Sequence, residues 1–232
     1  MVGTDTNVGK TYVGCLIVQA LRKRGHRVGV YKPVASGVGE DEQWEQSDPY
    51  LLWQAAGRMA SVHLVCPQNF RAPLAPPAAA EAEGKSVDGA LLRDGLSAWE
   101  PLCDLVLVEG VGGWFAPVSD SDLVCDLATE FGYPVVVVAA NRLGVINHTL
   151  LTVQAVHHAG LHVLGVILND PFQADRQDLS TRSNYRYLAR FCNAPILGQV
   201  HHGQTELPDH LTDRLLKRWE QAEDSAVLGG GA

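Results

Sequence analysis

The chain has 232 residues, of which 46% are hydrophobic, and a formal net charge of −8. This length and composition supply a full core without a structural metal, and five scattered cysteines with no C-x-x-C spacing indicate reduced thiols rather than a zinc or disulfide framework. The pI near 5.5 argues against nucleic-acid binding, which needs a basic face. No stretch approaches the roughly 20 apolar residues that cross a bilayer and no secretory leader opens the chain, so we expect a cytoplasmic protein without a membrane partner.

The predicted elements alternate between helix and strand. The pattern predicts a helix over 11–24, a strand over 28–32, a loop over 33–46, a helix over 48–56 and an irregular proline-rich crossing over 67–77. There follow a helix over 87–99, a strand over 105–108, a helix over 125–131, a strand over 135–139, a helix over 147–159, a strand over 163–168, a helix over 183–191 and a strand over 196–200. We expect one domain over 1–232, with a truncated first strand before Gly3 and a disordered tail over 225–232.

Residues 3–11, Gly-Thr-Asp-Thr-Asn-Val-Gly-Lys-Thr, run from a glycine-bounded loop into the first predicted helix. Gly3 and Gly9 permit a tight backbone whose N–H groups can face phosphate oxygens, while Lys10 supplies an ammonium and Thr11 a hydroxyl for Mg²⁺. The loop is one residue longer than the usual P-loop. An ordinary glycine turn before a helix is the alternative, but it predicts no Gly-Lys-Thr at the helix start. The stretch therefore predicts a nucleoside triphosphate site.

The predicted strands read as continuous aliphatic runs rather than as alternating patterns. Such runs are typical of parallel strands that are covered on both faces. The sequence therefore predicts an α/β fold, a P-loop NTPase-like parallel sheet with helices on both faces. Right-handed crossovers place the loops after all parallel strands at one edge. That edge is expected to gather residues 3–11, 32–37, 109–113, 141–147 and 169–170.

Two charged residues end predicted strands at this edge. Glu109 closes the apolar run 105–108, where a carboxylate can serve as a second Mg²⁺ ligand beside a P-loop, and the glycines that follow allow close backbone approach to phosphate. Lys32 leaves its strand at a rigid proline turn and can bring a second ammonium to a transferring phosphoryl group. A structural glutamate and a solvated surface lysine are the alternatives for these two residues.

Four segments together resemble the dethiobiotin synthetase family. They are residues 3–11, Lys-Pro-Val-Ala-Ser-Gly at 32–37, Val-Glu-Gly-Val-Gly-Gly-Trp-Phe-Ala-Pro at 108–117, and Leu-Gly-Val-Ile-Asn-His-Thr-Leu-Leu-Thr at 143–152. The similarity extends to about Val200, and the family's longer P-loop accounts for the extra residue. The resemblance implies an ATP- and Mg²⁺-dependent ligase of biotin biosynthesis, which forms C–N bonds between 7,8-diaminononanoate and CO2 or bicarbonate. It implies a carbamate and a carbamic–phosphoric anhydride as intermediates, with dethiobiotin, ADP and phosphate as products.

The same resemblance implies roles for individual positions. Lys32, Lys10 and Thr6 are the implied catalytic residues, and Thr11, Asp48 and Glu109 the implied Mg²⁺ ligands. The implied nucleotide contacts are Asn7, Val8, Gly9, Lys10, Thr11, Tyr12, Asp48, Glu109, Gly110, Val111, Gly112, Asn169, Asp170, His201, His202 and Gly203. The implied diamine contacts are Ser36, Gly144, Val145, Ile146, Asn147 and Tyr185, with the helix start at 144–147 contributed by the neighbouring subunit of a homodimer and its N–H groups facing the substrate carboxylate.

Several alternatives remain open from the sequence. Asp48 can be a helix N-cap, and Asn169 can be a turn residue before Asp-Pro. His201-His202-Gly203 departs from the family's proline and apolar residue, which leaves base selectivity open. A regulatory or partitioning P-loop ATPase is the rival function, although such switches carry a lysine early in the loop and none precedes Gly9 here. A related ligase that amidates a cobalamin precursor is a second rival, but the sequence shows no glutaminase domain.

Overall fold

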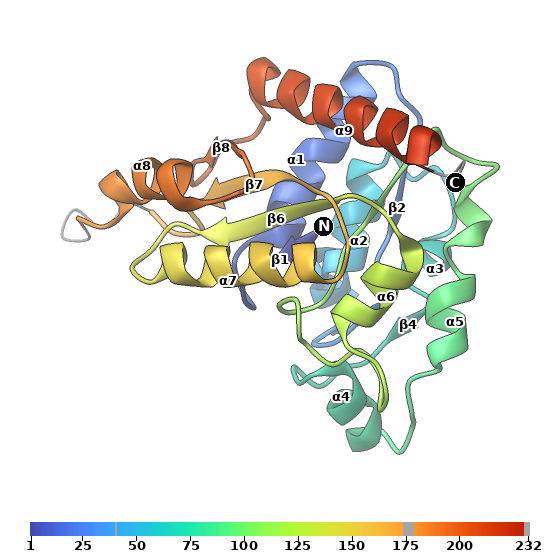
Figure 1. The fold of residues 1–232 in the computed structure, drawn as a ribbon. Coiled ribbons are helices and arrows are strands. Elements are labelled where there is room, and N and C mark those ends of the chain that lie inside the picture. The colour runs from blue at the N-terminus through green and yellow to red at the C-terminus, as the bar shows by residue number, and fades with distance from the viewer. Residues whose placement is uncertain (40, 174–178, 230–232) are drawn as a thin grey trace.

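A parallel sheet with helices on both faces forms the centre of the molecule (Figure 1). The structure, a computed structural model, describes residues 1–39, 41–173 and 179–229. Its strands are β1 (Val2–Gly3), β2 (Val28–Tyr31), β3 (Val34–Ala35), β4 (Gln68–Asn69), β5 (Leu105–Val108), β6 (Val135–Ala140), β7 (Val163–Asn169) and β8 (Ile196–Val200). Its helices are α1 (Lys10–Lys23), α2 (Asp48–Ala55), α3 (Val62–Val65), α4 (Pro76–Ala82), α5 (Gly89–Asp94), α6 (Val124–Phe131), α7 (Val145–His158), α8 (Thr181–Phe191) and α9 (Asp209–Gly229), with 3-10 turns at Asp41–Gln46 and Ser97–Trp99.

Every paired strand runs parallel to its neighbour. One sheet has the order β1-β6-β7-β8, and β2 pairs with β5 beside it. The amide N–H of Gly110 donates to the carbonyl of Met1, and Gly3 bridges Gly113 in parallel, so the chain after β5 runs along β1. All the loops that follow these strands therefore meet at one edge, as the aliphatic runs predicted.

The central strand β6 divides two apolar cores. Val136, Val138 and Ala140 pack on the side of α1 and α9, whereas Val135, Val137 and Ala139 pack on the side of α7. Figure 1 shows the red α9 and the yellow α7 on opposite sides of the sheet. This period-two division confirms the prediction of a sheet covered on both faces.

The strand β1 is two residues long and pairs with β6. An apolar cavity of about 140 Å³ lies beside Met1, between β5 and β6. Leu105 and Leu107 line one side of it, and Pro134 and Val136 line the other. Met1 borders this cavity: its amino group donates to the carbonyl of Val108 at 2.6 Å, and its carbonyl accepts from Gly110.

The predicted helix over 87–99 is wrong as one element, because it breaks into α5 and the turn at 97–99. The buried hydroxyl of Tyr31 donates to the carbonyl of Leu92 at 2.8 Å, taking an acceptor that a longer helix would use. Gly95 passes so close to the Tyr31 ring that a β-carbon there would lie 2.5 Å from its oxygen. A long-range contact therefore ends the helix.

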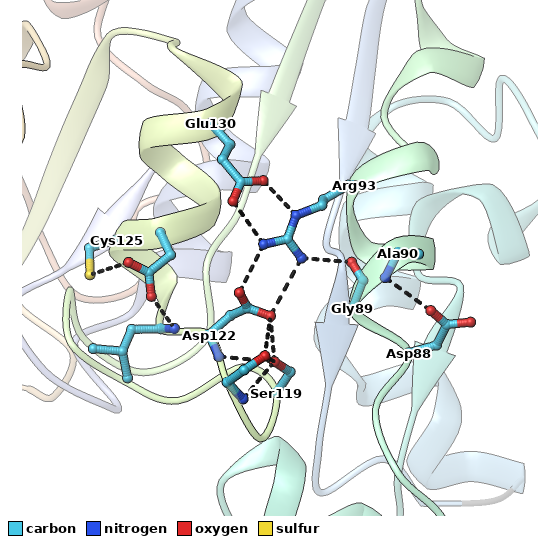
Figure 2. Close-up of polar contacts among 11 residues, drawn as sticks. Asp88, Gly89, Ala90, Arg93, Ser119, Asp122, Cys125 and Glu130 are labelled. Atoms are coloured by element: carbon cyan, nitrogen blue, oxygen red, sulfur yellow. Dashed lines mark hydrogen bonds and ion pairs between the residues drawn. The ribbon is translucent and has the colours of Figure 1, made fainter.

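Arg93 on α5 forms ion pairs that connect α5 to α6 (Figure 2). Its guanidinium donates to Asp122 at 2.8 Å and to Glu130 on α6 at 2.5 and 2.8 Å. Hydrogen bonds from Arg93 and Ser119 lower the pKa of the Asp122 carboxyl to about 2. The network holds the loop before α6 against α5.

Other predictions of local structure need correction. The expected loop over 33–46 contains β3 and a 3-10 turn, and the proline-rich stretch 67–77 contributes β4 and the start of α4. Helix α3 has no predicted counterpart, and neither has α9, whose backbone is helical to residue 229 although a disordered tail was expected from residue 225; residues 230–232 lie outside the described residues. None of the helices in the described part of the chain is long and apolar enough to cross a membrane.

Candidate active site

The loop after β1 has the backbone that its glycines predicted. Asn7 and Gly9 adopt left-handed conformations, with φ of 57° and 86°, and α1 begins at Lys10. A β-carbon on Gly9 would lie 2.1 Å from the side-chain nitrogen of Asn169, so no larger residue fits without movement. The loop thus turns tightly into a helix N-terminus, which suits an anion.

Lys10 connects this loop to the glycine-rich loop after β5. Its ammonium donates to the carbonyl of Gly112 at 2.6 Å, and its side chain is buried. Gly112 has a φ of 58°, and a β-carbon there would lie 3.5 Å from the hydroxyl of Thr6. Burial, reinforced by the nearby charge of Lys32, lowers the pKa of Lys10 to about 8. An incoming phosphate would supply the counter-charge that this ammonium lacks.

A cluster of four side chains lies beside Lys10. The ammonium of Lys32 is 2.7 Å from Glu109 Oε1 and 3.1 Å from Asp48 Oδ2. The hydroxyl of Thr11 donates to the same Glu109 Oε1 at 2.7 Å. Lys32 is 2% and Glu109 0% exposed, whereas the Asp48 side chain is half exposed. Lys32 therefore lies at the centre of the cluster and not at the protein surface.

The charges in this cluster stabilise one another. Burial alone would lower the pKa of Lys32, but the carboxylates of Glu109 and Asp48 outweigh burial and raise it above its usual value. Burial alone would raise the pKa of Asp48, but Lys32, Thr11 and Lys10 together lower it. The cluster therefore holds the Lys32 ammonium between the side chains of Asp48 and Glu109.

The residues of this cluster fit a magnesium ion. Glu109 Oε2 is buried and has no hydrogen-bond partner, and Asp48 and the Thr11 hydroxyl supply further hard oxygen donors. The described residues contain no group of three or more His, Cys, Asp or Glu side chains that could hold a metal alone. A magnesium ion here would take its remaining ligands from phosphate and water.

Asn169 and Asp170 end β7 at the other side of the loop. The Asn169 amide donates to the carbonyl of Val8 at 2.9 Å, and its buried oxygen has no partner. Asp170 accepts hydrogen bonds from Asn141 and Gln199 at 2.9 and 2.8 Å. Asn169 is therefore fixed to the phosphate loop and leaves an acceptor free.

The chain after β8 contacts the same group of residues. His201 Nδ1 lies 2.9 Å from Asp170 Oδ2. The hydroxyl of Tyr12 on α1 donates to the carbonyl of Gln204. The neighbouring His202 and Gly203 are exposed. The predicted nucleotide residues from the loops after β1, β7 and β8 therefore lie at one edge.

The predicted diamine residues are more spread out. Gly144, with a φ of 93°, begins α7, and Asn147 is exposed in its first turn; Val145 is buried and Ile146 half-buried. Ser36 is half-buried after β3, and Tyr185 lies on α8 with 38% of its surface exposed. Within the described residues, no hydrogen bond or ion pair joins Ser36 or Tyr185 to the phosphate loop.

Sequence reasoning missed the polar residues that hold these loops together. Arg142 pairs with Asp5 of the phosphate loop at 3.2 Å. Asn184 on α8 donates to Asn141 Oδ1 at 2.9 Å. Asn141, which follows a fully buried aliphatic strand directly, carries the same signal that singled out Asn169, whereas Arg142 and Asn184 carry no local signal.

Comparison with known proteins identifies the family. An AAA-domain family model matches residues 1–205. The chain is 44% identical to the ATP-dependent dethiobiotin synthetase BioD of Rhodopirellula baltica, over 86% of this chain and 82% of that protein. It is 38% identical to BioD 1 of Escherichia coli O157:H7, over 86% of this chain and 88% of that protein. The chain belongs to the dethiobiotin synthetase family.

Solved structures show how widely the fold of this dethiobiotin synthetase family member is shared. A putative plasmid partition protein from Borrelia burgdorferi, bound to AMPPNP, matches with a TM-score of 0.53 at 11% identity, over 95% of this chain and 96% of that one. Identity this low shows the fold alone. The match confirms the P-loop NTPase-like architecture, and the family comes from the sequence relatives.

Proposed function

We propose that this chain is an ATP-dependent dethiobiotin synthetase, a ligase of one domain that acts in the cytoplasm. It joins CO2 to 7,8-diaminononanoate and closes the ureido ring of dethiobiotin, with ATP converted to ADP and phosphate. The observation that carries the proposal is the placement of Lys32 against Glu109, beside Lys10 and Thr11. Two ammonium groups and a carboxylate thus meet at the loop that would hold a triphosphate.

The proposed reaction needs negative charge to be neutralised. A carbamate formed on one amine attacks the γ-phosphate of ATP, the bond from that phosphorus to ADP breaks, and the second amine displaces phosphate from the resulting anhydride. Lys10 and the N–H groups of residues 7–11 hold the β- and γ-phosphates, and Thr6 lies near the γ-phosphate. Lys32 neutralises the carbamate and the transferring phosphoryl group.

A metal would add to this neutralisation of charge. Thr11, Asp48 and Glu109 would hold Mg²⁺, which neutralises charge on the β- and γ-phosphates. The free acceptor of Asn169 suits the amino group of adenine, and Asp170 with the residues at 201–203 completes the base site. The nucleotide then lies along the edge from α1 to β8.

The diamine site is proposed to need two subunits. The helix start at 144–147 would face the diamine carboxylate of a neighbouring subunit in a homodimer, because its N–H groups and the helix dipole favour an anion. Ser36 and Tyr185 would contact the rest of the diamine. Sedimentation with and without the diamine tests this part, and a monomer at working concentration contradicts it.

A direct assay tests the function. The purified protein with ATP, Mg²⁺, bicarbonate and the diamine should form dethiobiotin and release one phosphate for each product. Phosphate release that does not depend on the diamine would instead favour a regulatory or partitioning ATPase. Lys32→Ala should abolish turnover while a non-hydrolysable ATP analogue binds within about tenfold of its normal affinity. Lys23→Ala, at an exposed lysine paired to Glu206, is the matched control and should retain turnover.

A further inference from the structure

The Lys32 ammonium contacts the side chains that would bind a metal. Its ammonium lies 2.7 Å from Glu109 Oε1 and 3.1 Å from Asp48 Oδ2, and Thr11 donates to that same Glu109 oxygen. These are the three side chains assigned to Mg²⁺ in the proposed function. The ammonium therefore uses the oxygens that the metal would need.

The Lys32 ammonium and a metal ion would repel each other at a shared oxygen. Magnesium binds oxygen ligands at about 2.0–2.1 Å in octahedral geometry. An ion bound to Glu109 Oε1 would then lie less than about 5 Å from an ammonium that remained 2.7 Å from the same oxygen. Because Glu109 is fully buried and Lys32 nearly so, little water is present to screen the repulsion between the two cations.

We propose that Lys32 is the resident counter-cation of the magnesium site in the nucleotide-free protein, and that it leaves Glu109 when metal arrives with the nucleotide. In the free protein the ammonium neutralises two carboxylates that would otherwise repel each other. When the metal binds, Lys32 releases Glu109 and turns toward the phosphates. The unpartnered Glu109 Oε2 offers the carboxylate a second oxygen for the ion.

This exchange has a functional consequence. Buried Glu109 and half-exposed Asp48 without an ammonium between them would attract divalent cations on their own, whereas the paired form admits metal only when the phosphates give Lys32 another anion to contact. The inference rests on the proposed metal ligands, but it does not depend on the diamine or on turnover. Its failure can therefore be told apart from a failure to form dethiobiotin.

The test measures Mn²⁺ binding to the nucleotide-free protein by electron paramagnetic resonance. Lys32→Met, which replaces the lysine by an unbranched side chain one atom shorter and without charge, should bind Mn²⁺ at least about tenfold more tightly than wild type, because a buried ion pair at this distance is worth more than one factor of ten. Lys23→Met removes a lysine that lies at the same 2.7 Å from a carboxylate but is exposed, and it should leave Mn²⁺ affinity unchanged. Equal or weaker binding in Lys32→Met, or no measurable binding in any of the three proteins, overturns the proposal.

A second measurement uses the wild-type protein and so does not depend on whether Lys32→Met folds. Crystal structures are determined with ADP alone and with ADP and Mg²⁺. With the metal present, we expect Lys32 Nζ to lie more than about 4 Å from Glu109 Oε1, beyond ion-pair distance. An ammonium that stays at 2.7 Å while magnesium binds Glu109 refutes the exchange, as does magnesium bound away from Glu109.

Discussion

Replacing Glu109 with glutamine should destabilise the protein far more than the loss of one charge at the surface would. The substitution keeps the shape and one acceptor oxygen, but it leaves the buried Lys32 ammonium with only the half-exposed Asp48 as a charged partner. Removing one partner of a buried ion pair costs about 3–5 kcal/mol of stability. The remaining pair of Lys32 with half-exposed Asp48 offsets at most about 1 kcal/mol of that cost. The expected loss of unfolding free energy for Glu109→Gln is therefore about 2–4 kcal/mol.

Thermal unfolding followed by circular dichroism measures this loss, which corresponds to a Tm lower by about 5–15 °C for a chain of this size. Glu206→Gln is the matched control, because Glu206 also lies 2.7 Å from a lysine but both side chains are largely exposed. The control should change stability by less than about 1 kcal/mol. The same Glu109 variant should require more Mg²⁺ for half-maximal turnover. Equal Tm values for the two variants would refute the argument that burial makes the Glu109 pair important.

Three further predictions follow from other parts of the structure. Gly9→Ala should lower Tm and weaken binding of an ATP analogue in calorimetry. The positive φ costs an alanine about 1–2 kcal/mol, and the new β-carbon would lie 2.1 Å from the Asn169 side chain. Unchanged affinity for the analogue would contradict this account of the Gly9 backbone. Nucleotide binding should take up a proton above pH 8, because burial lowers the pKa of Lys10 to about 8 in the free protein and a bound phosphate raises that pKa again. Nucleotide affinity should therefore be constant below pH 8 and fall above it. Equal calorimetric heats of binding at pH 9 in buffers of different ionisation enthalpy would refute the proton uptake. Arg93→Met should lower the free energy of unfolding by about 1–2 kcal/mol above pH 4, after allowance for solvent screening. This difference from wild type should shrink as pH falls through the Asp122 pKa of about 2. A difference that persists in acid denaturation at lower pH would show that charge is not its source.

Local patterns predicted the parts of the fold that repeat along the chain. Continuous aliphatic runs gave the buried strands, and a polar residue at the end of each run located Lys32, Glu109 and Asn169 at the edge where parallel strands end. Parallel topology alone brings such residues together, so their meeting was predictable. The contact of both Thr11 and Lys32 with the same oxygen of Glu109 was not, because it depends on side-chain geometry.

The remaining differences come from long-range contacts. Tyr31 ends α5, and Asn184 holds the loop after β6, yet neither residue has a local pattern that points to its partner. Helix α9 is a different case, since Leu211 and Leu215 carry the helical spacing that buries one face. That spacing lies among charged residues, and a search for aliphatic runs passes over it.

The two ammonium groups of the site come from different sheets. Lys32 and Glu109 follow β2 and β5, which pair with each other, whereas Lys10 follows β1 in the larger sheet. The loop after β5 connects the two: the Gly110 amide donates to the carbonyl of Met1, and the Gly112 carbonyl accepts from Lys10 at 2.6 Å. The spacing of the two ammonium groups thus depends on the backbone course of residues 110–112.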